Sequence, residues 1–185
     1  MTGPDVERDV FRRHATSVNV PHWLSSLGRM NTLAAWAEHV AEALLQVSLP
    51  RRWAHVQGVA DRARSLAPVL GADAELLEAA AWLHDIGYAP GLTRTGLHQL
   101  DGARYLRDAQ HAGALLCRLV AHHSCAIIEA GERGIAVVLS SEFDPAPDAL
   151  SSVLTCCDMT TSPDGELVPA EQRLAEIHDR YGPGT

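Results

Sequence analysis

The sequence lacks several features, and each absence excludes a class of function. All 15 of its basic residues are arginine, so no lysine is present to act as a nucleophile or to form a Schiff base. None of the four cysteines forms a CxxC pair, which points to reduced thiols rather than a disulfide framework. No stretch is long and apolar enough to span a membrane, and the N-terminus has no hydrophobic signal segment. We therefore expect a cytoplasmic protein with no membrane partner.

Basic charge is also in short supply. The net charge is -8 at pH 7, and no basic stripe is present that could displace counterions from nucleic acid. This composition argues against nonspecific nucleic-acid binding. Aromatic residues make up only 5% of the chain, whereas alanine, leucine and valine are abundant, which favours helices over sheet. A length of 185 residues is enough for one domain with its own core.

The hydrophobic pattern predicts an all-α bundle of about seven helices. Residues 1–30 show no sustained period, and we expect a loosely ordered extension with a short helix near Val6–His14. Residues 31–182 would form the domain. The run 135–139 fits either a strand or a helix, and a short helix is expected at 126–131. The main helices are expected near residues 31–49, 51–67, 73–84, 98–108, 112–123, 148–159 and 170–181.

Six histidine and aspartate side chains stand at or near the ends of these apolar runs. His84 and Asp85 end the run AAWLHD, where a charged pair is costly in a core but well placed to bind a metal. A helical bundle can bring such residues together at one point, and a carboxylate such as Asp85 can bridge two cations. The six candidate ligands are His55, His84, Asp85, His98, His122 and Asp158.

The ligand types indicate which metals would bind. Imidazole and carboxylate without thiolate suit Fe, Mn, Ni, Co or Zn, whereas Mg prefers sites made only of oxygen. We therefore expect one or two divalent transition metal ions. Two such ions can lower the pKa of a bridging water to give hydroxide, the nucleophile of phosphoester hydrolysis, and Asp85 would be the catalytic bridge.

The order of these ligands resembles the HD-domain superfamily of metal-dependent phosphohydrolases. The resemblance rests on the HDIG motif at His84–Gly87, on His55 upstream, and on Asp158 in the segment CDM. HQLDGARYL resembles the H-P-x-x-G-A segment of many members, with Gln99 in place of proline, and LVAHHS resembles an I-x-x-H segment in which His122 is in register. The family resemblance implies that His55, His84, Asp85 and Asp158 are core ligands, and that His98 and His122 complete a second metal site. The six-ligand set is similar to that of dinuclear members.

The expected substrate is a small phosphomonoester or phosphoanhydride, such as a nucleotide. Arg94, Arg104 and His123 are candidate phosphate contacts, because the arginine fork matches phosphate geometry. Tyr88 and Thr93 lie in the loop after the HD pair and would line the entrance. Two alternatives stay open: a mixed-valent di-iron oxygenase, and a non-catalytic module that binds or senses a nucleotide. A homodimer is one oligomeric state compatible with the sequence.

Overall fold

The computed structural model describes residues 32–182, and this part of the chain is helical without a named strand. The predicted all-α class is confirmed. A single antiparallel bridge joins Thr161 to Leu167. The expected extension at 1–30, with its helix at Val6–His14, lies outside the described residues. The helices are α1 (Leu33–Leu45), α2 (Pro50–Ser65), α3 (Ala67–Leu70), α4 (Ala74–Leu83), α5 (His98–Asp108), α6 (Ala114–His122), α7 (Ala126–Glu132), α8 (Ala136–Glu142), α9 (Asp148–Met159) and α10 (Ala170–Tyr181), with 3-10 turns η3 (Gly71–Asp73) and η4 (Ile86–Tyr88).

Local signals fix most of the helix boundaries. The Thr32 hydroxyl accepts a hydrogen bond from the Ala35 amide at 3.1 Å and caps α1. Helix α1 ends at Leu45, before Pro50, and Pro50 occupies the first turn of α2, where a backbone N–H would have no partner within the helix. The open choice at 135–139 resolves as helix, because α8 covers Ala136–Glu142. Short helices such as α3 raise the total above the seven expected.

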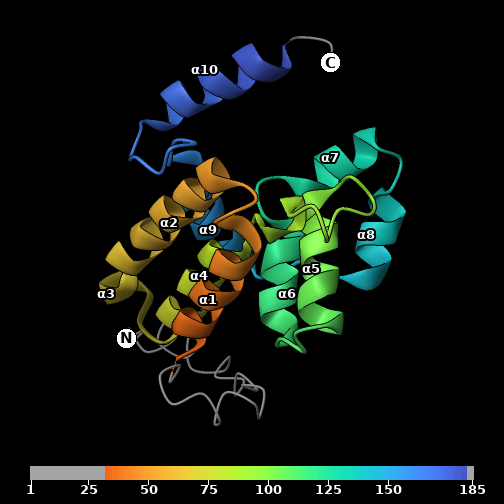
Figure 1. The fold of residues 1–185 in the computed structure, drawn as a ribbon, viewed down its shortest axis with the longest axis horizontal. Coiled ribbons are helices and arrows are strands. Elements are labelled where there is room, and N and C mark those ends of the chain that lie inside the picture. Colours follow the sequence, from red (N-terminus) through yellow and green to blue (C-terminus); the bar gives the residue numbers. More distant parts are fainter. Residues whose placement is uncertain (1–31, 183–185) are drawn as a thin grey trace, which may run out of the picture.

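Helix α4 forms the centre of the bundle. It packs against α1, α2, α6 and α9, and Leu77, Ala80 and Leu83 have no exposed surface. Figure 1 shows α1 and α2 on one side of the molecule and α5 and α6 on the other, with α7 and α8 at the outer edge. The C-terminal ends of α4 and α6 and the first residue of α5 therefore meet in the interior, where α2 and α9 also pass.

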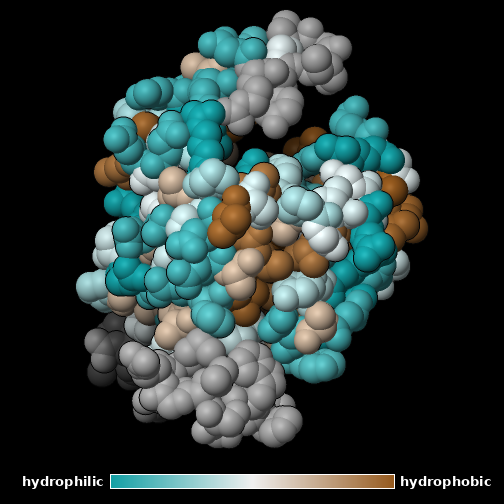
Figure 2. Space-filling model, in the orientation of Figure 1, coloured by the Kyte–Doolittle hydropathy of each residue, from teal (hydrophilic) through white to brown (hydrophobic). Residues whose placement is uncertain are grey.

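Helix α10 lies at the periphery of the molecule and contacts α9. In Figure 1 it lies above α2 and α9. The visible face of the body in Figure 2 is mostly hydrophilic, with a few apolar side chains near its centre. Among the described residues, no helix has the length and hydropathy needed to cross a membrane.

Candidate metal centre

Six ionisable side chains from separate elements meet in the interior of the bundle. His55 belongs to α2, His84 caps the C-terminus of α4, and Asp85 follows directly before η4. The other three come from the first residue of α5, the C-cap of α6 and the last turn of α9, namely His98, His123 and Asp158. All six are buried, with between 0% and 9% of each residue exposed. Burial of this many ionisable groups is costly unless they share a cation or a hydrogen-bond network.

Backbone carbonyl groups orient three of the four imidazole rings. Nδ1 of His84 donates to the carbonyl oxygen of Ala81 at 2.7 Å, and Nδ1 of His123 donates to that of Val120 at the same distance. Nδ1 of His55 donates to the carbonyl oxygen of Ser162 at 2.9 Å. These bonds fix the tautomer, so that Nε2 of each neutral ring carries a lone pair directed into the cluster.

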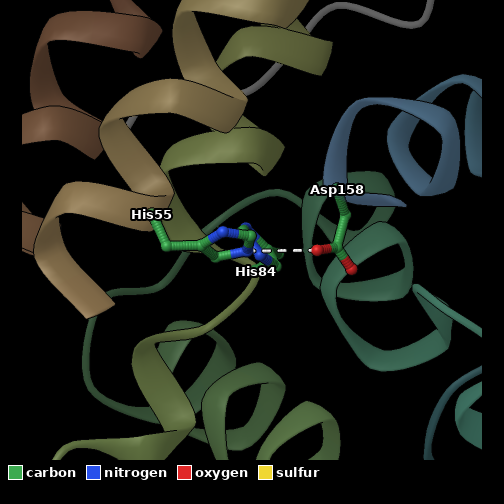
Figure 3. A group of neighbouring side chains, drawn as sticks. All are labelled: His55, His84 and Asp158. Atoms are coloured by element: carbon green, nitrogen blue, oxygen red, sulfur yellow. Dashed lines mark hydrogen bonds and ion pairs between the residues drawn. The ribbon is translucent and has the colours of Figure 1, made fainter. Parts of the chain in front are cut away.

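Among His55, His84 and Asp158, the closest contact is between His55 and Asp158. Nε2 of His55 lies 3.1 Å from Oδ1 of Asp158, and Figure 3 shows these groups together with His84. Burial lowers the pKa of His55, but its bond to Asp158 and the charges of Asp85 and Asp158 outweigh this effect and leave the pKa raised. A lone pair facing a carboxylate is repulsive, so this contact requires either a proton on the ring or a cation beside it.

Asp85 separates two pairs of histidines. Its Oδ2 lies 3.5 Å from Nε2 of His84 and 3.9 Å from Nε2 of His55. Its Oδ1 lies 3.2 Å from Nε2 of His98 and 3.9 Å from Nε2 of His123. Each carboxylate oxygen therefore faces one pair of nitrogens, which is the arrangement that a bridge between two cations requires.

The electrostatics of the buried cluster favour the metal-binding protonation states of three groups, His84, His123 and Asp85. Burial lowers the pKa of His84. Burial, followed by repulsion from His84 and His98, lowers the pKa of His123 to about 3. Burial alone would raise the pKa of Asp85, but His84, His98 and Arg52 together hold it well below its usual range. Neutral imidazole and ionised carboxylate are the forms that coordinate a cation.

The residues present fit a metal ion. Nε2 of His84 is a buried polar atom without a hydrogen-bond partner in the described structure, and groups of this kind are rare unless a ligand satisfies them. His55, His84 and Asp158 offer ligand atoms that all lie within 4.8 Å of one another, and so do His84, Asp85 and His123. Two ligands at right angles, each about 2.1 Å from an ion, are about 3 Å apart. The 3.1 Å between His55 and Asp158 matches that spacing.

The structure places His123, rather than the expected His122, in the cluster. Nε2 of His122 donates to the carbonyl oxygen of Phe143 at 2.7 Å and ties α6 to the end of α8. Periodicity does not decide between the two, since Leu119 and Val120 are both buried and a step of three from them leads to His122 and to His123 respectively. The motif resemblance pointed to His122, whereas the contacts of the two rings with Phe143 and Val120 place His123 in the cluster.

The expected substrate contacts lie in different places. Tyr88 reaches the cluster, because its ring stacks on that of His98 with centroids 4.0 Å apart. Thr93 and Arg94 are exposed on the loop between η4 and α5. Arg104 is bound by Glu142 on α8, with Nε 3.1 Å and 3.2 Å from the two carboxylate oxygens. Arg104 therefore serves the contact between α5 and α8, and His123 belongs to the ligand cluster itself.

One arginine that reaches the cluster was not among the expected residues. The guanidinium of Arg52 donates to Oδ2 of Asp85 and lies over the ring of Tyr88, with Cζ 3.8 Å from the ring centroid. Its side chain is 31% exposed, whereas that of Asp85 is 5% exposed, so Arg52 links the buried carboxylate to solvent. The available signal was spacing: Arg52 precedes His55 by three residues, which places both on one face of α2.

Two close backbone approaches hold the ligands in place. A Cβ on Gly58 of α2 would lie 2.2 Å from the carbonyl oxygen of Gly165, so the loop that carries Ser162 can rest directly on α2. Likewise, a Cβ on Gly87 would lie 1.9 Å from the carbonyl oxygen of His98, so only glycine allows α5 to begin there. These contacts explain how His55 and His98 acquire their positions.

Comparisons with known proteins are consistent with this geometry. The sequence profile described as HD domain matches residues 52–181, which is most of the chain. The chain is 29% identical over 122 residues to Ribonuclease Y of Chloroflexus aurantiacus, a match that covers 64% of this chain but only 22% of that protein. The search of solved structures found no match.

Proposed function

The chain belongs to the HD domain family, and from this premise we propose that it is a metal-dependent phosphohydrolase that acts on a small phosphomonoester or phosphoanhydride, such as a nucleotide. The observation that carries the proposal is the position of Asp85, whose two oxygens face two different histidine pairs. Phosphoester hydrolysis needs a strong local positive charge and an activated water, and a cluster of this composition can hold the ions that provide both.

We propose one or two divalent transition ions for this site, held by His55, His84 and Asp158 on one side and by His98 and His123 on the other, with Asp85 shared. Fe, Mn, Ni, Co and Zn suit the imidazole-rich set better than Mg does. When bound, such an ion supplies Lewis acidity, which lowers the pKa of a water molecule and offsets charge on the phosphoryl oxygens. The carbonyl partners of His55, His84 and His123 keep the ring nitrogens aimed at the site throughout.

Arg52 is the residue that we propose to bind a phosphoryl oxygen. It stands at the edge of the cluster, is partly exposed, and is kept there by the ring of Tyr88. A guanidinium can exchange a carboxylate partner for a phosphate, since both present oxygen pairs of similar geometry. Tyr88 then acts through its ring, which contacts both Arg52 and His98.

A small substrate is favoured over a long nucleic acid. The name Ribonuclease Y describes an enzyme that acts on RNA, but the chain corresponds to only 22% of that protein. A net charge of -8 opposes the attraction of a polyphosphate backbone. We infer that the two proteins share phosphoester chemistry, and that the acidic composition of this chain does not favour a polymeric substrate.

The proposal is tested by stripping the protein of metal, reloading it separately with Mn, Fe, Co, Ni, Zn or Mg, and measuring phosphate release from nucleotides and small phosphoesters without oxygen. We expect turnover with at least one transition ion, loss of both metal binding and turnover in Asp85→Ala, and retention of both in the exposed control Asp61→Ala. Full activity of Asp85→Ala would contradict the assignment. Turnover that requires oxygen would indicate the oxygenase alternative, and binding without turnover would indicate a sensor.

A further inference from the structure

The turn between α6 and α7 has an unusual backbone. Ser124 and Cys125 follow His123 directly, and both adopt left-handed conformations, with φ of 47° and 61°. Residues other than glycine, asparagine and aspartate seldom occupy this region, because their Cβ approaches the neighbouring carbonyl. Two such residues in succession persist only where surrounding contacts hold them.

Two hydrogen bonds attach Ser124 to α9. Its backbone amide donates to Oγ1 of Thr155 at 3.3 Å, and its hydroxyl donates to Oδ2 of Asp158. Thr155 and Asp158 are three residues apart and therefore lie on the same face of α9. Ser124 thus joins the end of α6 to the last turns of α9 at two points, and one of those points is a ligand of the cluster.

The bond from Ser124 determines which oxygen of Asp158 faces the cluster. With Oδ2 accepting from the Ser124 hydroxyl, Oδ1 is the atom left near His55, at 3.1 Å from Nε2. Without that hydroxyl, the carboxylate could rotate about its terminal bond or offer both oxygens to one cation. Since His123 is the preceding residue, the same turn also positions a histidine on the other side of Asp85.

We propose that Ser124 is a positioning residue that holds Asp158 with a single oxygen toward the metal centre. It also links that ligand to His123, which lies on the other side of Asp85. The inference rests on the metal centre of the proposed function, but it concerns ligand orientation rather than turnover. A hydroxyl that orients a metal-binding carboxylate strengthens metal binding, and the loss of such a hydrogen-bond partner typically weakens metal affinity about 10- to 100-fold.

The test compares Ser124→Ala, which removes the hydroxyl and keeps Cβ, with Ser124→Gly, which removes the hydroxyl and also relieves the left-handed backbone. Ser152→Ala is the matched control, because Ser152 lies exposed on the same helix as Asp158. Each full-length protein is stripped of metal and titrated with Co²⁺ against a competing chelator. The visible absorption spectrum of the Co²⁺ form reports coordination geometry, and the melting temperature of the metal-free form reports folding.

We expect both Ser124 variants to bind Co²⁺ about 10- to 100-fold more weakly and to show an altered spectrum. Ser152→Ala should match the wild type, and Ser124→Gly should melt no lower than Ser124→Ala. Wild-type affinity and spectrum in either Ser124 variant would overturn the proposal. If Ser124→Ala does not fold, Ser124→Gly decides the question alone. A wild-type protein that binds Co²⁺ but hydrolyses nothing would contradict the proposed function and leave this inference standing.

Discussion

Nε2 of His98 lies 3.2 Å from Nε2 of His123, so two ring nitrogens face each other in the interior of the protein. Nδ1 of His123 is committed to the carbonyl oxygen of Val120, so its Nε2 offers a lone pair. This contact between the two Nε2 atoms is favourable only if Nε2 of His98 carries a proton or if both nitrogens bind one cation.

Metal should stabilise the folded protein measurably. An ion that binds only the folded state at 100 times its Kd adds about 2.7 kcal/mol to the free energy of unfolding. For a chain of this size, that gain raises the melting temperature by roughly 5–10 °C. Thermal unfolding of stripped and reloaded protein measures the effect. His84→Ala should melt at the same temperature with and without metal, and an equal metal-induced rise in that variant would count against the centre.

Replacement of the two adjacent histidines, His122 and His123, should affect different properties of the protein. His123→Ala removes a cluster nitrogen and should lower metal affinity and phosphate release by at least about 100-fold, by comparison with changes at supporting residues. His122→Ala removes a hydrogen bond to the carbonyl of Phe143 and should cost about 1 kcal/mol of stability while activity is retained. Metal titration and urea unfolding of both variants separate the two roles. The reverse pattern would restore His122 as the ligand.

The metal-free protein should become less stable as the solution is acidified. Burial is the main reason that the pKa of His123 is lowered to about 3. Between the ordinary histidine pKa and pH 3, the unfolded chain therefore binds a proton at this residue that the folded chain does not bind. His84 acts in the same direction. The raised pKa of His55 acts oppositely, since its contribution is full below its ordinary pKa and is lost only as pH rises through the raised value. Urea unfolding should therefore show declining stability from about pH 6.5 to pH 4. Constant or rising stability over that range would show that the histidines are not buried in neutral form.

Arg52 and its neighbour Arg51 should differ in their effect on turnover. Arg51→Ala breaks an ion pair with Asp164 in which both side chains are 64% exposed, and little change in activity is expected. Arg52→Ala removes the guanidinium at the edge of the cluster and should lower kcat/KM by about 10- to 100-fold, or roughly 1.4–2.7 kcal/mol of transition-state stabilisation. Steady-state kinetics on the substrate found in the metal panel measures both. Equal effects of the two substitutions would assign Arg52 a purely structural role.

Close packing between α2 and the loop that follows α9 should be sensitive to one methyl group. Gly58→Ala would place Cβ 2.2 Å from the carbonyl oxygen of Gly165, so the loop must move and carry Ser162 away from His55. We expect lower stability together with weaker metal binding. Gly131→Ala is the control, because that Cβ meets nothing within 4 Å in α7, and alanine there should stabilise the helix by about 1 kcal/mol. Calorimetry and metal titration would reveal an unaffected Gly58→Ala protein if this account is incorrect.

Periodicity was sufficient to predict most of the fold. The long helices α1, α2, α4, α5, α6, α9 and α10 correspond to expected segments because each presents a regular apolar stripe. The segment that forms α8 stayed open between strand and helix, since a short apolar run such as 135–139 has no readable period. The short helix α3 is not predicted by the sequence, because a proline such as Pro68 commonly ends a helix, whereas here it lies in the first turn of α3.

The sequence predicted which elements would supply the candidate ligands but not how those ligands would be supported. Histidine and aspartate at the ends of apolar runs are costly without a partner, and His55, His84, Asp85, His98 and Asp158 do lie together. The supporting groups could not be inferred, because Ser162 and Ser124 act through contacts between elements far apart in the chain. The partner of Arg104, an expected substrate residue, could not be inferred either, because Glu142 lies 38 positions away.

The distance along the chain between His55 and Asp158, 103 positions, has a consequence for biosynthesis. A nascent polypeptide that has emerged only as far as α6 already displays its histidines, yet it lacks the carboxylate of α9 and the loop carbonyl that aims His55. For the proposed metal centre, such an unfinished chain would lack part of the binding site. We therefore expect tight ion binding only once the chain has been synthesised through Ser162.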